Sequence, residues 1–190
     1  DCGGQGVAAS APPALPVREQ FVFYDIILRN NGGGGVQASN ASDVALERVI
    51  ATGCGGAGVD VAASNGGYLV IKRKDVMITS CVGPGVHVVT EGASSVALDH
   101  VRALDNTGNG IEVFSITGRG TVATGRIECT NNGGSGLLFD LTGASGGELR
   151  VAESSFSSNG VHGVHVYGDN MQTPAADRRR IIKHREAGDE

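Results

Sequence analysis

A short motif recurs along the whole chain: a glycine, an aliphatic residue, any residue and then usually an apolar residue. The glycines that open it, called marker glycines below, are Gly6, Gly35, Gly58, Gly85, Gly110, Gly136 and Gly163. They lie 23 to 29 residues apart. A recurring period of this length is typical of repeat proteins, in which each repeat forms one winding of a solenoid.

Residues at equal distances from successive marker glycines are alike. The position four residues before the marker holds only Asn or Cys: Cys2, Asn31, Cys54, Cys81, Asn106, Asn132 and Asn159. Each repeat also has three short segments with apolar residues two apart, which is the period of a β-strand. Gly and Asn between the segments favour turns with positive φ. The pattern predicts an all-β parallel β-helix of six to seven coils, each with three short strands stacked ~4.8 Å from their neighbours.

Composition excludes several other classes. The chain has 31 Gly among 190 residues but only 5 Pro, and its glycines do not recur at every third position, which excludes collagen. Its net charge of −5 disfavours a nucleic-acid partner, because phosphate binding requires a basic surface. No apolar run reaches the ~18 residues of a membrane span. The four Cys lack the paired spacing of a zinc site.

The turns resemble those of the right-handed parallel β-helix (pectin-lyase-like) superfamily, in particular the Asn-Gly repeats of its carbohydrate-binding and sugar-hydrolase members. The residues that carry the resemblance are 30–32, 106–111, 131–136 and 158–160. It covers about residues 1 to 169 and implies a right-handed solenoid that binds or modifies polysaccharide. The superfamily includes lyases, hydrolases, epimerases and inert spacers. No strand carries the Gly-Phe-Asp-Pro-His motif of mannuronan C5-epimerases, and the sequence identifies neither a cofactor nor a Ca²⁺ site.

The two ends of the chain differ. Residues 1–170 form the predicted β-helix domain, and residues 171–190 form a cap or tail. Thr173 followed by Pro174 is typical of a helix start, so we expect a short capping helix over residues 174–187. Cys2 and Gly6 already occupy repeat positions. We therefore expect either a piece cut from a longer solenoid or self-association through the first, uncapped coil.

A cysteine pair and an arginine fall at interior positions of the predicted coils. Cys54 and Cys81 occupy the same repeat position in successive coils, where their Cα atoms are expected to be close enough for a disulfide. Because their side chains should point the same way, we favour two unpaired cysteines that act as small apolar core residues. Arg73, within the basic run 72–74, falls at a core position of the third coil. Because a buried unpaired Arg is costly, Leu69 and Ile71 are expected to take the core positions through a shifted turn. Lys72 and Arg73 then either contact a carboxylated sugar or form a charged turn.

Function is expected on the outer face of the strands that follow the marker glycines. Two residues after the marker, Asp60, His87 and Glu112 should stack on adjacent coils, with His165 further along. We select His87, His165 and Tyr167 as catalytic candidates, because His and Tyr transfer protons. Substrate contacts are assigned to Asp60, Glu112, Phe114 and Asp140. The alternative is that these polar side chains only support strand pairing. A surface charge ladder explains Asp75, Asp99, His100 and Arg126.

These observations favour an extracellular, periplasmic or cell-surface domain that binds or modifies an acidic, uronic-acid polysaccharide. If the domain is catalytic, lyase or C5-epimerase chemistry is expected. The alternative is a non-catalytic spacer or surface-fibre segment of a larger repeat protein, which the shortness of the loops favours. Ice binding would require a flat threonine-rich column, and the outward positions counted contain none.

Overall fold

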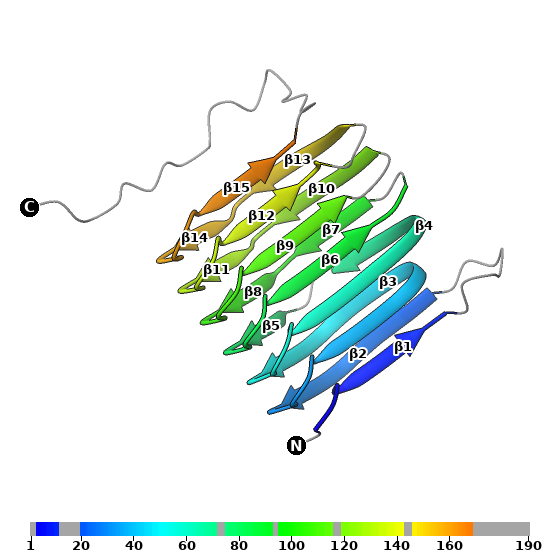
Figure 1. Ribbon diagram of the computed structural model, residues 1–190. Coiled ribbons are helices and arrows are strands. Elements are labelled where there is room, and N and C mark those ends of the chain that lie inside the picture. Colours follow the sequence, from blue (N-terminus) through cyan, green and yellow to red (C-terminus); the bar gives the residue numbers. More distant parts are fainter. Residues whose placement is uncertain are drawn as a thin grey trace, which may run out of the picture.

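The computed structural model describes residues 3–11, 20–71, 75–92, 95–115, 119–142 and 146–168. In this part the chain forms fifteen β-strands and no helix. Every pairing between these strands is parallel. Figure 1 shows them stacked in successive windings along one axis. The predicted all-β parallel solenoid is confirmed, whereas the capping helix expected over residues 174–187 lies outside the described residues.

Three sheets run along the tube. The first sheet contains β1 (Val7–Ser10), the start of β3 (Val36–Thr52), the start of β4 (Val59–Ile71), β6 (Val86–Thr90), β9 (Ile111–Ser115), β12 (Leu137–Asp140) and β15 (Val164–Tyr167). The second sheet contains the start of β2 (Gln20–Arg29), the middle of β3, the end of β4, β7 (Ser95–Asp99), β10 (Arg119–Gly125) and β13 (Gly146–Ala152).

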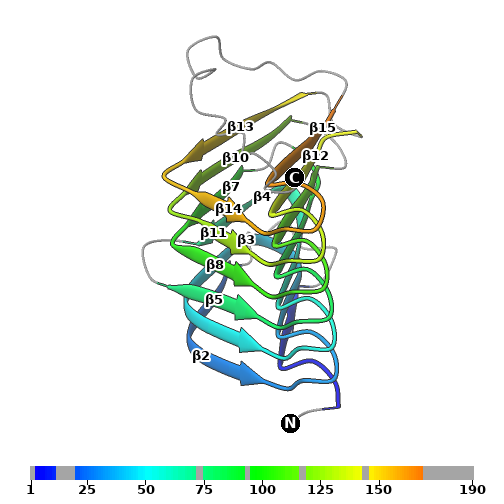
Figure 2. The ribbon, with the colours of Figure 1, turned by 90° about the vertical axis from the view of Figure 1, so that its left-hand side faces the viewer.

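The third sheet contains the ends of β2 and β3, followed by β5 (Val76–Thr79), β8 (Val101–Leu104), β11 (Glu128–Thr130) and β14 (Ser155–Ser157). Figure 2 shows its strands β2, β5, β8, β11 and β14 one above another. Among the described residues the first sheet thus has seven segments and each of the others six. Six windings contribute one segment to each sheet, as the repeat predicts, and β15 adds a seventh segment to the first sheet.

The corner between the second and third sheets is a single residue with positive φ. Asp25 (φ 54°) lies inside β2 and Arg48 (φ 52°) inside β3, so both strands pass the corner without a break. His100, Arg126 and Glu153 turn the chain at the same corner. The expectation of Gly and Asn at the turns is therefore wrong here. Each corner side chain borders solvent, and Arg48 donates to the Asp25 carboxylate, so charge pairing along the corner offsets backbone strain.

The marker glycines are required for close approach and not for positive φ. A Cβ atom on Gly110 would lie 2.6 Å from the carbonyl oxygen of Gly136, and one on Gly136 would lie 2.7 Å from that of Gly163. Positive φ occurs instead five residues before most markers, at Asn30, Gly53, Ser80, Asp105, Asn131 and Ser158. The repeat therefore encodes both a turn and a tight contact between windings.

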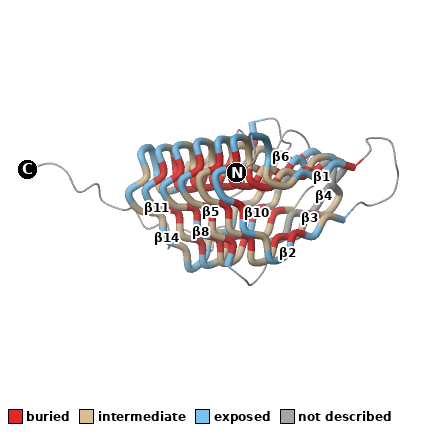
Figure 3. The backbone as a smooth tube through the Cα atoms, turned by 90° about the horizontal axis from the view of Figure 1, so that it is seen from below, coloured by how far each residue is buried: buried red, intermediate tan, exposed pale blue. Residues whose placement is uncertain are grey.

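Alternate side chains of each strand fill the tube. In β6, Val86 and Val88 are fully buried, and the residue between them is half-buried. Figure 3 shows the buried residues recurring from winding to winding. The register shift expected in the third coil is confirmed, because Leu69 pairs with Val44 and Val96, two buried residues of the second sheet. Lys72 and Arg73 lie outside the described residues.

The Asn and Cys column forms the inner corner beside the first sheet. Asn106 Nδ2 donates to Asn132 Oδ1 at 3.0 Å, and Asn132 Nδ2 donates to Asn159 Oδ1 at 3.0 Å. The same oxygens accept from the backbone N–H groups of Asn106 and Asn132. Cys54 and Cys81 continue the column as buried free thiols, as the filler interpretation expects. Hydrogen bonds thus link the later windings through their side chains.

Candidate functional site

The first sheet aligns three charged side chains on its outer surface. Asp60 of β4 pairs with His87 of β6, and His87 pairs with Glu112 of β9. Their flanking residues point inward, since the neighbours of His87 are fully buried valines. The three side chains remain 33%, 28% and 15% exposed, respectively. The register therefore brings together three of the residues selected from the sequence.

His87 is bonded on one side only. Its Nδ1 lies 2.8 Å from Asp60 Oδ1, within hydrogen-bond distance. Its Nε2 lies 3.7 Å from Glu112 Oε1, which is close enough for charge attraction but too far for a hydrogen bond. The Phe114 ring meets the imidazole edge-on, with ring centres 5.7 Å apart. The bond to Asp60 thus leaves Nε2 as the nitrogen that can meet a ligand.

The carboxylates stabilise the charged imidazole. The pKa of His87 is raised above its usual value, chiefly by the hydrogen bond to Asp60, with the charges of Glu112 and Asp60 adding to it and partial burial opposing it. The pKa of Asp60 is lowered by the same hydrogen bond. A partly exposed histidine with one nitrogen on a carboxylate and no hydrogen bond at the other has the arrangement of a general acid or base.

Two amides support the carboxylates, and both lie outside the site residues selected from the sequence. Gln37 Nε2 donates to Asp60 Oδ2 at 3.3 Å. Asn109 Nδ2 donates to Glu112 Oε2 at 2.6 Å, while its Oδ1 accepts from the backbone N–H of Ser135 at 2.7 Å. Asn109 precedes its marker glycine by one residue. In the sequence, the only sign of its hydrogen bond to Glu112 is that the two residues are three positions apart. These residues, with Asp60, His87, Glu112 and Phe114, are called the His87 cluster below.

A second cluster lies on the last described winding. The ring centres of His165 and Tyr167 in β15 are 4.1 Å apart, and those of His162 and His165 are 4.5 Å apart. His162 is not among the site residues selected from the sequence. Leu138 of β12 stands between Glu112 and His165 in the register, so the two histidine groups are separate. His162, His165 and Tyr167 are called the His165 cluster below.

Asp140 belongs to neither cluster. It stands between Phe114 and Tyr167 in the register of the first sheet. Its Oδ1 accepts from the Thr142 backbone N–H at 2.8 Å and from the Thr142 hydroxyl. The structure thus places Asp140 at the end of β12, where it orders the following turn.

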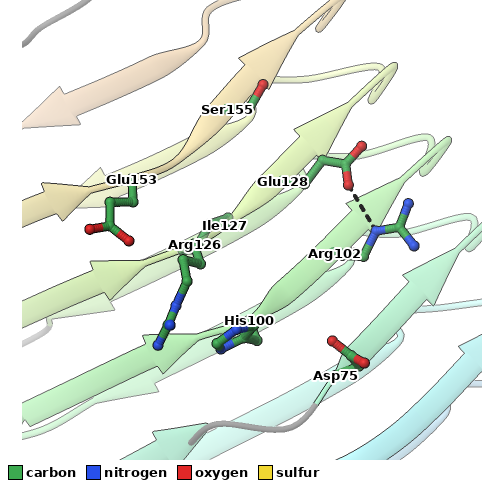
Figure 4. Close-up of a pocket in the computed structure, with 8 residues that line it drawn as sticks. All are labelled: Asp75, His100, Arg102, Arg126, Ile127, Glu128, Glu153 and Ser155. Carbon is green, nitrogen blue, oxygen red and sulfur yellow. Dashed lines mark hydrogen bonds and ion pairs between the residues drawn. The ribbon is translucent and has the colours of Figure 1, made fainter.

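A shallow pocket of about 400 Å³ lies on the other side of the tube, along the corner between the second and third sheets. Figure 4 shows its lining residues: Asp75, His100, Arg102, Arg126, Ile127, Glu128, Glu153 and Ser155. Arg102 Nε donates to Glu128 at 2.8 Å, and Arg126 Nη2 donates to Asp99 at 2.6 Å. Because both guanidinium groups are paired, this surface fits the predicted charge ladder better than a ligand site.

Threonines recur in one outward column of the third sheet, which lies outside the outward positions compared in the sequence. One outward column of that sheet contains Arg29, Thr52, Thr79, Leu104, Thr130 and Ser157. Leu104 interrupts the hydroxyl groups, and the Arg102–Glu128 ion pair lies in the adjacent column. The column therefore does not present the regular flat array that ice binding requires.

The described residues contain no group of three or more His, Cys, Asp or Glu side chains arranged to hold a metal ion. That part of the chain also has no helix long and apolar enough to cross a membrane.

A family model described as a right-handed beta helix region matches residues 17–177. The comparisons with curated proteins and with solved structures give no match. The matched range covers most of the 190 residues and includes both histidine clusters. Together with three parallel sheets wound in succession, this match shows that the chain belongs to the right-handed β-helix family.

Proposed function

We propose that this domain binds polysaccharide along the outer face of its first sheet, with the His87 cluster as the main contact. The observation that carries the proposal is the group of Asp60, His87 and Glu112, which presents a partly exposed donor between two acceptors. Sugar hydroxyls require both kinds of partner. The neighbouring Phe114 ring adds an apolar face of the sort on which sugar rings stack.

The spacing of the windings supports a linear ligand. Strands of the first sheet follow one another at ~4.8 Å, so polar groups on successive windings repeat at about the length of one sugar unit. A chain lying along the axis would meet the His87 cluster, then Leu138 and Asp140, and then the His165 cluster. The seven described segments of this sheet offer the longest such path among the three sheets.

Charge decides which class of glycan is bound. His87 and His165 attract a uronic acid when protonated, whereas Asp60 and Glu112 repel it. We therefore propose an acidic glycan whose affinity rises as the pH falls and the imidazoles become charged. A neutral glycan held by hydroxyl contacts would lack this strong dependence on pH and on salt.

Proton transfer is the second candidate function, and it is favoured by the Nε2 of His87, which has no hydrogen bond to Glu112. In a uronic acid the proton at C5 is acidified by the adjacent carboxyl group. A neutral His87 would remove that proton; elimination of the neighbouring glycosidic oxygen then gives a lyase, and return of a proton to the other face gives an epimerase. His165 and Tyr167 lie three strand spacings from His87, about 14 Å, so they remain candidates for proton transfer at a separate position along the polymer and not for this step.

The test compares the wild-type domain with His87→Ala and His100→Ala on an array of alginate, pectate, glycosaminoglycans and neutral glucans. His100 lies on the corner between the other two sheets and is the matched control. We expect His87→Ala to lose binding and His100→Ala to keep it, with the unfolding free energy of both within about 1 kcal/mol of wild type. Incubation with the bound polymer, followed by ultraviolet absorbance of unsaturated uronates and by solvent deuterium exchange at C5, tests for lyase and epimerase activity. A wild-type domain that binds no glycan would overturn the proposal and favour the spacer.

A further inference from the structure

The two histidines of the last described winding form a side-chain pair that is not used for folding. His162 is exposed in the turn before β15, and His165 is half-buried in that strand. Their ring centres are 4.5 Å apart, and the ring planes make an angle of 85°. Neither ring has an ion pair or a side-chain hydrogen bond with another described residue. Both imidazoles are therefore free to bind a ligand.

The solenoid backbone fixes the places at which these two side chains leave the chain. They stand one residue before and two residues after the marker Gly163, which is the relation between Asn109 and Glu112 about Gly110. In that earlier winding the two side chains meet at 2.6 Å. The turn of the last winding is also anchored, because Gly136 N donates to His162 O at 2.8 Å and Leu137 N donates to Gly163 O at 2.9 Å. The His162–His165 pair is thus held by a geometry that recurs within the fold.

The separation of the rings matches that of two imidazoles on one metal ion. With metal–nitrogen bonds of ~2 Å, imidazoles in adjacent positions of a square-planar ion have ring centres ~4.5 Å apart, and in a tetrahedral ion ~5 Å. Square-planar coordination by nitrogen and oxygen is typical of Cu²⁺ and Ni²⁺. We propose that His162 and His165 form a two-histidine site for such a divalent transition-metal ion, with water completing its coordination.

Tyr167 has a supporting role in this site. Its ring lies against His165, with centres 4.1 Å apart and planes tilted by 42°. This contact limits rotation of the His165 side chain, while the exposed His162 ring can turn to bring its nitrogen to the ion. Because a ligating imidazole must be neutral, protons compete with the metal, and binding weakens on acidification. This acid dependence is opposite to that proposed for the acidic glycan.

The test titrates the full chain with Cu²⁺ by calorimetry and by electron paramagnetic resonance, and repeats the titration with Ni²⁺ and Zn²⁺. Each of the five histidines (His87, His100, His162, His165 and His184) is replaced in turn by Ala. We expect one Cu²⁺ per chain with a spectrum of two coordinated nitrogens, tighter binding of Cu²⁺ than of Ni²⁺ or Zn²⁺, and a loss of at least about tenfold in affinity in His162→Ala and His165→Ala only.

Circular dichroism of each variant checks that the fold is retained. His162→Ala is the decisive variant, because an exposed turn residue can be replaced with little effect on folding. No Cu²⁺ binding by the wild type, or a loss of affinity confined to other histidines, would overturn the proposal. Neither result bears on the glycan proposal, which His87→Ala tests separately.

Discussion

His87 and His165 occupy equivalent positions on the same sheet, each two residues after a marker glycine, yet their surroundings differ. His87 has a carboxylate on the winding before it and another on the winding after it. His165 has Leu138 on the preceding winding and two aromatic rings beside it. In a solenoid, the chemistry of a surface residue is therefore set by residues one winding away and not by its neighbours in the chain.

The windings differ inside as well. Beneath the His87 cluster the inner corner holds the thiols of Cys54 and Cys81, and burial together with the nearby Cys54 raises the pKa of Cys81 to about 12. Beneath the His165 cluster the same corner holds Asn132 and Asn159, which are linked by amide hydrogen bonds. The backbone frame is common to both regions, so paired substitutions can separate the effect of the side chain from that of the fold.

The largest difference is expected inside the tube. Asn132→Ala removes the acceptor for two donors of Asn106 and leaves buried polar groups unpaired, which should lower the unfolding free energy by about 3 kcal/mol. Cys81→Ala removes only a small buried group and should cost about 1 kcal/mol. Urea unfolding measures both. An equal cost for the two variants would mean that the amide ladder adds nothing beyond packing.

A smaller difference is expected at the residue before the marker. Asn109→Ala leaves the backbone N–H of buried Ser135 without its acceptor and should cost about 1–3 kcal/mol. His162→Ala, at the equivalent position, should stay within about 0.5 kcal/mol of wild type. Thermal and urea unfolding of the two variants test the contrast. A destabilised His162→Ala would show that the histidine supports the last winding.

The pH dependence of stability should reflect His87. Its pKa in the folded state is raised, so its stabilising effect is fully present below the unfolded pKa of ~6.5 and is lost as the pH rises through the folded-state pKa. The effect should be below about 1 kcal/mol, because the side chains are partly exposed. His87→Gln should flatten this decline, and His165→Gln, the matched substitution, should keep it. The measurement is the unfolding free energy at pH values from roughly 5.5 to 8.5, a range that spans the ordinary histidine pKa.

The smallest perturbation is the loss of one charge. Asp60→Asn removes the carboxylate that does most to raise the pKa of His87, and this pKa should fall. His165 is the internal control, because Asp60 and His165 lie on windings separated by β6, β9 and β12. Proton NMR titration of the two imidazoles follows both residues in one sample. An unchanged His87 pKa would contradict the hydrogen bond to Asp60.

Much of this arrangement could be predicted, because the marker glycines fix the register of the first sheet. Counting two residues on from Gly58, Gly85 and Gly110 leads to Asp60, His87 and Glu112, and the structure pairs them in that order. The shift in the third coil was predictable too, since the cost of a buried charge excludes Arg73 from the core.

The corner conformations and the side-chain contacts of the turns could not be predicted from the repeat. Arg48 and Arg126 adopt positive φ although their residue type does not indicate it, because ion pairing at an exposed corner is not visible in a single repeat. The contacts Asn109–Glu112 and His162–His165 depend on how the turn folds back beside its own strand, which the column pattern does not describe. The outward column of Thr52 and Thr79 lies on the third sheet, away from the face on which the outward positions were compared.

Because successive windings pair in a regular register, surface positions on this domain are evenly spaced along its axis. Two surface groups on the first sheet are separated by a whole number of strand spacings, so deleting the chain between Gly110 and Gly136 would bring His87 and His165 closer by one step of ~4.8 Å. The markers on either side of the cut are equivalent, so the joined chain would keep its register. Distances on this surface can therefore be edited in discrete units, which most globular folds do not allow.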